Sequence, residues 1–115
     1  MPNFEAGDVV AVPFPYTDKA TRQRRPALVV SAGPLLNDHG LLWVLMITSA
    51  ENRAWPDDIG ISDLLSAGLP VPSVIRTAKI ATIEAKDAEK LGTVTAEVRK
   101  GVGAILNRRL NAIQA

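Results

Sequence analysis

Four cationic side chains lie within one short polar segment, and they are Lys19, Arg22, Arg24 and Arg25. An arginine guanidinium donates two parallel hydrogen bonds to phosphate oxygens and keeps its charge near neutral pH. The segment is therefore suited to binding phosphates and to stabilising negative charge that develops on them. A second basic cluster near the C-terminus is interpreted as a solvated face. Its members are Arg99, Lys100, Arg108 and Arg109.

Proton transfer requires a different group, because an arginine with a pKa above about 12 is a poor general base. Asp18 is the only carboxylate between Thr17 and Arg24. It is our candidate proton acceptor, and a simple turn residue is the competing interpretation. His39 is the only histidine, the residue type that most often serves as acid or base near neutral pH. It lies in the turn-like stretch Asn37–Gly40, so we expect a loop role for it.

The sequence offers no evident metal or cofactor site. Asp57 and Asp58 are adjacent carboxylates, but no histidine or third carboxylate stands at ligand spacing, so we place them in a turn. The absence of cysteine excludes a disulfide framework, a cysteine-based zinc site and a thiol nucleophile. We expect no cofactor.

Length and composition indicate one globular domain spanning residues 1–115. Hydrophobic residues make up 47% and charged residues 22%, and the net charge of +1 gives no general argument for nucleic-acid binding. The N-terminus lacks a signal-peptide pattern, and the longest apolar run, Leu41–Ile47, is far shorter than the roughly 20 residues that span a bilayer. We expect a cytoplasmic protein with no membrane contact, and a homodimer, because so small a chain gains from covering apolar surface.

The first half of the chain predicts strands. Apolar, β-rich stretches at Val9–Phe14 and Ala27–Val30 are joined by a polar loop, which favours an antiparallel pair. Loop residues are expected from Gly33 to Gly40. Leu41–Ile47 then reads as a strand buried on both faces at the centre of the core, with Trp43 in that core.

The second half predicts shorter elements and a terminal helix. After the polar stretch Glu51–Asp58 we expect a short strand at Ile59–Ile61 and a helical turn at Ser62–Ala67 with Ser62 as its N-cap. Short strands follow at Ser73–Ile75 and Lys79–Ile83. The final helix is capped by Thr95 and carries apolar residues at helical spacing. They are Val98, Val102, Ile105, Leu106, Leu110 and Ile113. Many short strands with one terminal amphipathic helix suggest a curled, SH3-like barrel.

Four sequence blocks, in this order, resemble the MazF/PemK family of toxins. The first is Gly7-Asp-Val-Val-Ala-Val-Pro-Phe-Pro-Tyr-Thr-Asp18, and the second is Arg24-Arg-Pro-Ala-Leu-Val-Val-Ser31. The third is Met46-Ile-Thr-Ser49. The fourth combines Ala67-Gly-Leu-Pro70 with Pro72-Ser-Val-Ile-Arg76 and Lys79-Ile-Ala-Thr-Ile83. The resemblance covers nearly the whole chain.

This resemblance implies a mainly β fold with a C-terminal helix, the small SH3-like barrel of CcdB/PemK toxins. It also implies a homodimer, the toxin component of a type II toxin-antitoxin system, which cleaves single-stranded RNA or mRNA and is inhibited by a cognate antitoxin. RNA carries its own nucleophile, the 2′-hydroxyl, so such an enzyme needs to position it, move protons and neutralise charge, without a metal ion.

The resemblance assigns catalytic roles to Arg25, in the Arg-Pro-Ala block, and to Thr48, at the end of the third core strand. Asp18 is the third catalytic candidate. Further side chains are expected to bind RNA, Trp55 by stacking on a base. They are Lys19, Arg22, Arg24, Ser49, Trp55, Arg76 and Lys79.

Two other functions remain open. One is a CcdB-like toxin that binds DNA gyrase without cleaving nucleic acid. Such relatives end in Trp-Gly-Ile, whereas this chain ends in Asn111-Ala-Ile-Gln-Ala115, which counts against that function. The other is a cleavage-dead RNA-binding or regulatory module on the same fold, which the unidentified general base leaves open.

Overall fold

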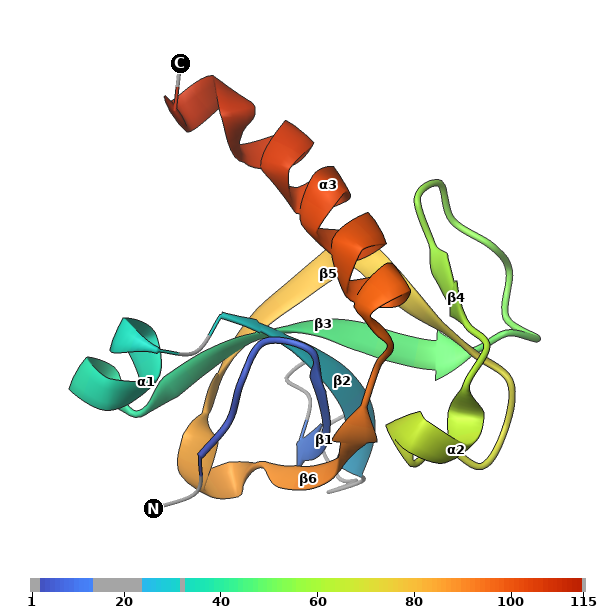
Figure 1. The fold of residues 1–115 in the computed structure, drawn as a ribbon, viewed down its shortest axis with the longest axis horizontal. Helices are drawn as coiled ribbons and strands as arrows, with labels where there is room; N and C mark the ends of the chain where they lie inside the picture. The colour runs from blue at the N-terminus through green and yellow to red at the C-terminus, as the bar shows by residue number, and fades with distance from the viewer. Residues whose placement is uncertain (1–2, 14–23, 32, 115) are drawn as a thin grey trace.

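The computed structural model describes residues 3–13, 24–31 and 33–114. Within these residues six strands form one antiparallel sheet in the order β4-β5-β3-β2-β1-β6. The sheet curls into a half-barrel with the C-terminal helix packed across it, which confirms the expected fold class (Figure 1). The elements are β1 (Asp8–Pro13), β2 (Arg24–Ser31), α1 (Pro34–His39), β3 (Leu41–Ser49), β4 (Ile59–Ile61), α2 (Leu64–Ala67), β5 (Ser73–Glu84), η1 (Ala85–Asp87), β6 (Glu89–Thr93) and α3 (Ala96–Gln114).

Strands β1 and β2 form the expected antiparallel pair. Their register runs from Val9 opposite Leu28 to Pro13 opposite Arg24. Strand β2 begins three residues earlier than the apolar pattern indicated, because backbone pairing with β1 continues through Pro26 to the two arginines. The arginines are therefore held on a strand.

Strand β3 is buried on both faces, as expected, and it joins two cores. Leu42 and Val44 pack into the core formed with β1 and α1, while Leu45 and Ile47 pack beneath α3. The expectation for Trp43 was wrong, because its side chain is 43% exposed. It lies near the start of β3, as its third residue.

Strand β5 is one strand of 12 residues, where the sequence predicted two short ones. Its pairing with β3 is interrupted between Ile80, opposite Leu45, and Arg76, opposite Met46. Residues 77–79 are thus extra on the β5 side and form a bulge. This bulge interrupts the alternation of side chains between the two faces of the sheet, but the strand continues through it.

Three further elements differ from the sequence prediction. Residues 34–39 form helix α1, which begins with Pro34, ends at His39 and is followed by the C-cap Gly40 in the left-handed conformation. Helix α2 is capped by Asp63, which accepts a hydrogen bond from the Ser66 amide at 3.1 Å, so Ser62 is not the N-cap. Strand β6 was not predicted, and it covers the free edge of β1.

Helix α3 begins as expected, with the Thr95 hydroxyl accepting a hydrogen bond from the Val98 amide at 3.3 Å. Val98 and Val102 are buried against the sheet, but Leu110 is 49% and Ile113 is 86% exposed. The second half of the helix projects beyond the sheet (Figure 1), which leaves these two apolar side chains exposed. In the described part of the chain, no helix is long and apolar enough to cross a membrane.

Candidate active site

Arg25 is the second residue of β2 and lies opposite Val12 of β1. Its side chain is half-buried, and its Nε atom is buried without a hydrogen-bond acceptor among the described residues. A buried guanidinium N–H that lacks a partner carries a substantial desolvation cost. An anionic oxygen placed at this atom would remove that cost.

Arg24 has a different environment. Its guanidinium donates to the carbonyl of Asp87 at 2.5 Å and lies 3.5 Å from the Glu89 carboxylate. Both side chains of this ion pair are largely exposed, so the pair contributes little to stability and its cation remains accessible to other anions. The structure thus separates the two neighbouring arginines: Arg24 contacts β6, and Arg25 lies half-buried in the sheet.

Thr48 lies at the end of β3, next to Ser49. Its Oγ1 accepts a hydrogen bond from Asn52 Nδ2 at 2.6 Å. The Ser49 hydroxyl accepts one from the Glu51 amide at 3.2 Å, and the Asn52 amide donates to the Ser49 carbonyl at 3.1 Å. A tight turn therefore follows β3 and folds back onto Thr48.

The strand register brings Arg25 and Thr48 to the same end of the sheet. Ala27 pairs with Met46, and each of the two candidates lies two residues beyond that pair. Side chains two residues apart on a strand share a face, so Arg25 and Thr48 project on the face that carries Ala27 and Met46. These are the two residues that the resemblance assigned to catalysis.

Arg76 is placed differently from its expected role in RNA binding. It is only 7% exposed, and its Nη2 donates to Asp58 Oδ2 at 2.9 Å and to the Arg53 carbonyl at 2.7 Å. Its Nε donates to Asp58 Oδ1 at 3.3 Å. Because the guanidinium is buried and occupied, direct contact with RNA is not the role that this placement favours. Arg76 instead fixes the segment from Arg53 to Asp58 against β5.

The carboxyl of Asp58 titrates below its ordinary range. Burial raises its pKa, but hydrogen bonds from Arg76 and from the Trp55 amide, with the charge of Arg76, outweigh burial and lower the pKa below 3.8. Asp58 is therefore ionised at neutral pH. This ionised carboxylate also holds Trp55, whose amide donates to Asp58 Oδ2 at 2.9 Å.

Trp55 lies beside two cations. The guanidinium carbon of Arg76 is 4.5 Å and the Lys79 ammonium 5.4 Å from the centre of its ring. Both distances are typical of cation–π contacts. The half-buried ring is therefore held in place at the edge of the segment that follows β3.

The C-terminal helix fastens the same segment, which the sequence did not reveal. Arg109 donates to the Thr77 carbonyl at 2.7 Å and to Asp57 Oδ2 at 3.1 Å, and Arg108 lies 3.6 Å from Asp57 Oδ1. The Thr77 hydroxyl donates to the Asp57 carbonyl at 2.9 Å. The basic cluster that we interpreted as a solvated face thus includes two arginines that bind a loop. Asp57 lies in a turn, as expected, with φ of 69°.

Three predicted site residues, Asp18, Lys19 and Arg22, lie outside the described residues. His39 is exposed in the last turn of α1, which precedes β3, whereas Thr48 is near the other end of β3. His39 is therefore remote from Arg25 and Thr48. Within the described ranges, no three His, Cys, Asp or Glu side chains gather to hold a metal ion.

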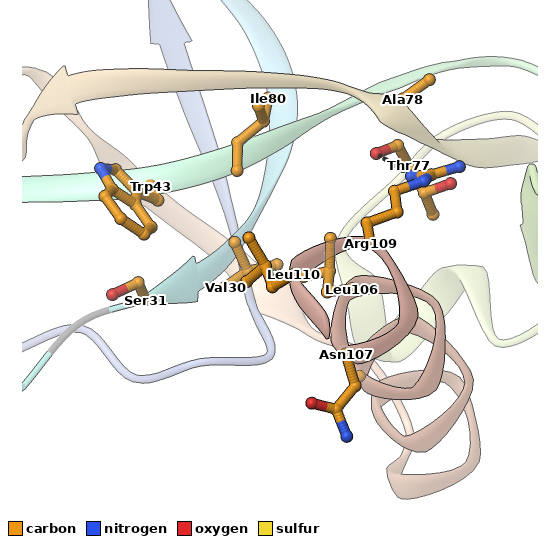
Figure 2. Close-up of a pocket in the computed structure, with 11 residues that line it drawn as sticks. Val30, Ser31, Trp43, Thr77, Ala78, Ile80, Leu106, Asn107, Arg109 and Leu110 are labelled. Carbon is orange, nitrogen blue, oxygen red and sulfur yellow. Dashed lines mark hydrogen bonds between the residues drawn. The ribbon is translucent and has the colours of Figure 1, made fainter. Parts of the chain in front are cut away.

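An apolar groove of about 610 Å³ lies between α3 and the face of the sheet on which α3 packs. Val30, Trp43 and Ile80 on the sheet face Leu106 and Leu110 on the helix (Figure 2). This groove is on the face opposite to Arg25 and Thr48, because Trp43 projects from the other side of β3 than Met46 and Thr48.

Comparison with known protein families shows the family to which the chain belongs. A family model described as PemK-like, MazF-like toxin of type II toxin-antitoxin system matches residues 5–110. The chain belongs to this toxin family. The matched residues include the sequence blocks that contain Arg25 and Thr48, and the family is the one that these blocks resemble. No curated protein is significantly similar to the chain in sequence.

Solved structures of MazF toxins share the fold. MazF of Deinococcus radiodurans is 25% identical, with a TM-score of 0.72 over 93% of this chain and 96% of that chain. A MazE–MazF structure from the same organism is 26% identical, with a TM-score of 0.72 over 92% of this chain and 93% of that chain. An endoribonuclease in complex with its cognate antitoxin, from a mycobacterial species, is 19% identical over 92% of this chain and 93% of that chain, and its TM-score of 0.69 shows the fold alone.

Proposed function

We propose that this PemK/MazF-type toxin is an endoribonuclease that cleaves single-stranded RNA, such as mRNA, without a metal ion. The proposal rests mainly on the environment of Arg25, whose buried Nε has no acceptor among the described residues. Arg25 also lies at the same end and on the same face of the sheet as Thr48. An RNA phosphate supplies the acceptor that Arg25 Nε lacks among the described residues.

In the proposed reaction the 2′-oxygen attacks the adjacent phosphorus and the bond to the 5′-oxygen breaks. The products are a 2′,3′-cyclic phosphate and a 5′-hydroxyl. Arg25 neutralises the charge that builds up on the non-bridging oxygens, and the Thr48 hydroxyl donates to one of them. The 2′-hydroxyl loses its proton and the departing 5′-oxygen gains one, and Asp18 is our candidate for accepting the first proton.

The remaining residues are proposed to guide the RNA strand. Arg24, Ser49 and Lys79, with Lys19 and Arg22 from the polar sequence between β1 and β2, supply hydrogen bonds or positive charge to the RNA backbone. Trp55 is proposed to stack its ring on a base, and the Arg76 and Lys79 cations lie against the same ring. Arg76 is proposed to act through Trp55 and Asp58, by holding the loop that these two residues occupy.

Two protein partners belong to the proposal. The Deinococcus radiodurans relative has been solved with MazE, which supports a cognate antitoxin as the partner of this cytoplasmic toxin. A homodimer is supported by the apolar groove of Figure 2, whose lining includes the exposed side chains of Trp43 and Leu110. Ile113, outside the groove lining and one turn further along α3, is also exposed. Exposed apolar surface of this kind is typical of protein interfaces.

The test incubates the purified protein with a long single-stranded RNA, with and without EDTA, and analyses the ends of the products. We expect cleavage under both conditions. RNA binding without cleavage would indicate the cleavage-dead module. Inhibition of DNA gyrase with intact RNA would indicate the gyrase-binding alternative.

A further inference from the structure

We infer that Asn52 is a positioning residue for the Thr48 hydroxyl, a role that rests on the proposed cleavage reaction. Asn52 Nδ2 lies 2.6 Å from Thr48 Oγ1 and donates to it. By occupying a lone pair of this oxygen, the amide leaves the single hydroxyl proton of Thr48 to be donated to an RNA phosphate.

The backbone around Asn52 is fastened on both sides. Before it, the Ala50 amide donates to the Pro72 carbonyl at 2.9 Å, and the Asn52 amide donates to the Ser49 carbonyl at 3.1 Å. After it, the Arg53 carbonyl accepts from the buried Arg76 guanidinium at 2.7 Å. The side chain is exposed, but its backbone is held, so its amide starts from a fixed position at the end of β3.

The chemistry of the threonine hydroxyl gives this contact its consequence. The hydroxyl has one proton and two lone pairs, and it rotates to suit its neighbours. A donor at one lone pair restricts that rotation and polarises the O–H bond, which strengthens the hydrogen bond that the proton then makes. Without Asn52 the hydroxyl is free to rotate toward water or backbone carbonyls.

The direction of the hydrogen bond is open to a direct test. An asparagine amide carries both a donor and an acceptor, whereas an ionised aspartate only accepts. Asn52→Asp would therefore draw the Thr48 proton toward the carboxylate and away from the substrate. If the hydroxyl instead donated to Asn52 in the native protein, the aspartate would preserve that hydrogen bond.

The experiment measures single-turnover cleavage and RNA affinity for the wild type, Asn52→Ala, Asn52→Asp, Thr48→Val and the double variant Thr48→Val/Asn52→Ala. We expect Asn52→Ala to slow cleavage about 3–10-fold, the loss of one neutral hydrogen bond, with RNA affinity within about twofold. Asn52→Asp should be slower still. In the Thr48→Val background, Asn52→Ala should change the rate less than about twofold, because residues that act through one contact are not additive.

Asn37→Ala is the matched control, because Asn37 is an exposed asparagine on α1, at the other end of β3. It should cleave at the wild-type rate. Cleavage at the wild-type rate by Asn52→Ala or Asn52→Asp would overturn the proposed role of Asn52 and leave the proposed mechanism standing. An equal effect of Asn52→Ala with and without Thr48 would do the same. Absence of cleavage by the wild type, or full activity of Thr48→Val, would overturn the proposed mechanism and this inference with it.

Discussion

Arg76 and Asp58 form a buried, bidentate ion pair. Arg76 Nη2 lies 2.9 Å from Asp58 Oδ2, and Arg76 Nε lies 3.3 Å from Asp58 Oδ1. The pair connects β5 with the loop that follows β3. The same loop contains Asn52 and Trp55, and it is also held by Arg109 of α3. Two elements distant in sequence, β5 and α3, thus fix the shape of the loop beside Thr48.

Replacing Arg76 should destabilise the protein. Arg76→Ala leaves the ionised Asp58 carboxylate buried without its partner, and breaking a buried pair in this way typically costs about 3–5 kcal/mol. Urea denaturation measures the change in the free energy of unfolding. Arg53→Ala is the matched control, because the Arg53 side chain is exposed while its carbonyl remains available to Arg76. An equal, small effect of both variants would show that the ion pair does not hold the loop.

The lowered pKa of Asp58 gives stability a defined pH dependence. Because the folded pKa lies below the ordinary value of 3.8, the contribution of Asp58 is fully present above that value. It is lost as pH falls from about 4 through the folded pKa, where the native carboxylate takes up its proton.

We therefore expect the free energy of unfolding of the wild type to fall more steeply below about pH 4 than that of Asp58→Asn, which has no proton to take up. Urea titrations between pH 3 and pH 6 measure both slopes. Asp38→Asn controls for the loss of an exposed carboxylate. Parallel curves for the wild type and Asp58→Asn would refute the assignment.

His39 should contribute little to catalysis. It is exposed on α1, at the end of β3 opposite to Thr48. His39→Ala should keep the cleavage rate within about tenfold of the wild type, because a working acid or base contributes about 10²–10⁴. Single-turnover cleavage rates of the wild type and His39→Ala at neutral pH test whether His39 takes part in proton transfer. A loss of a hundredfold in a folded variant would make His39 a proton-transfer group.

The apolar groove should be part of a subunit interface. Light scattering at micromolar concentration should give about twice the chain mass of 12.3 kDa for the wild type. Leu110→Glu should give the single-chain mass, because a charge in an apolar interface is costly to bury. Leu65→Glu, at an exposed position of α2, adds the same charge elsewhere and should leave the dimer intact. A wild-type mass of 12.3 kDa would contradict this expectation.

The sequence predicted those elements whose pattern depends on local composition. The continuous apolar run identified β3, and the helical spacing with Thr95 identified α3. Helix α1 was missed because its Gly33-Pro34 start is also typical of a turn. Strand β6 was missed because its residues are largely polar and exposed, and it is a strand through its pairing with β1.

In the candidate site, too, the sequence identified residues by local pattern but not the contacts that depend on the fold. Arg25 and Thr48 were identified through the family blocks, but their common sheet end depends on the pairing of β2 with β3. Arg76 reads as a surface cation in the sequence, and its burial depends on Asp58, 18 residues away. Asn52 gave no signal, because its contact with Thr48 exists only when the turn after β3 has formed.

The most direct test of the account is single-turnover cleavage of a short oligonucleotide that carries its only 2′-hydroxyl at the scissile nucleotide. Removing one donor to developing charge typically costs about 10²–10³ in rate, so we expect at least that loss in Arg25→Ala, with circular dichroism confirming a folded variant. Thr48→Val should lose less. Cleavage by the wild type should persist in EDTA and yield a 2′,3′-cyclic phosphate. Full activity of Arg25→Ala, or cleavage of the same oligonucleotide without its 2′-hydroxyl, would contradict the proposed mechanism.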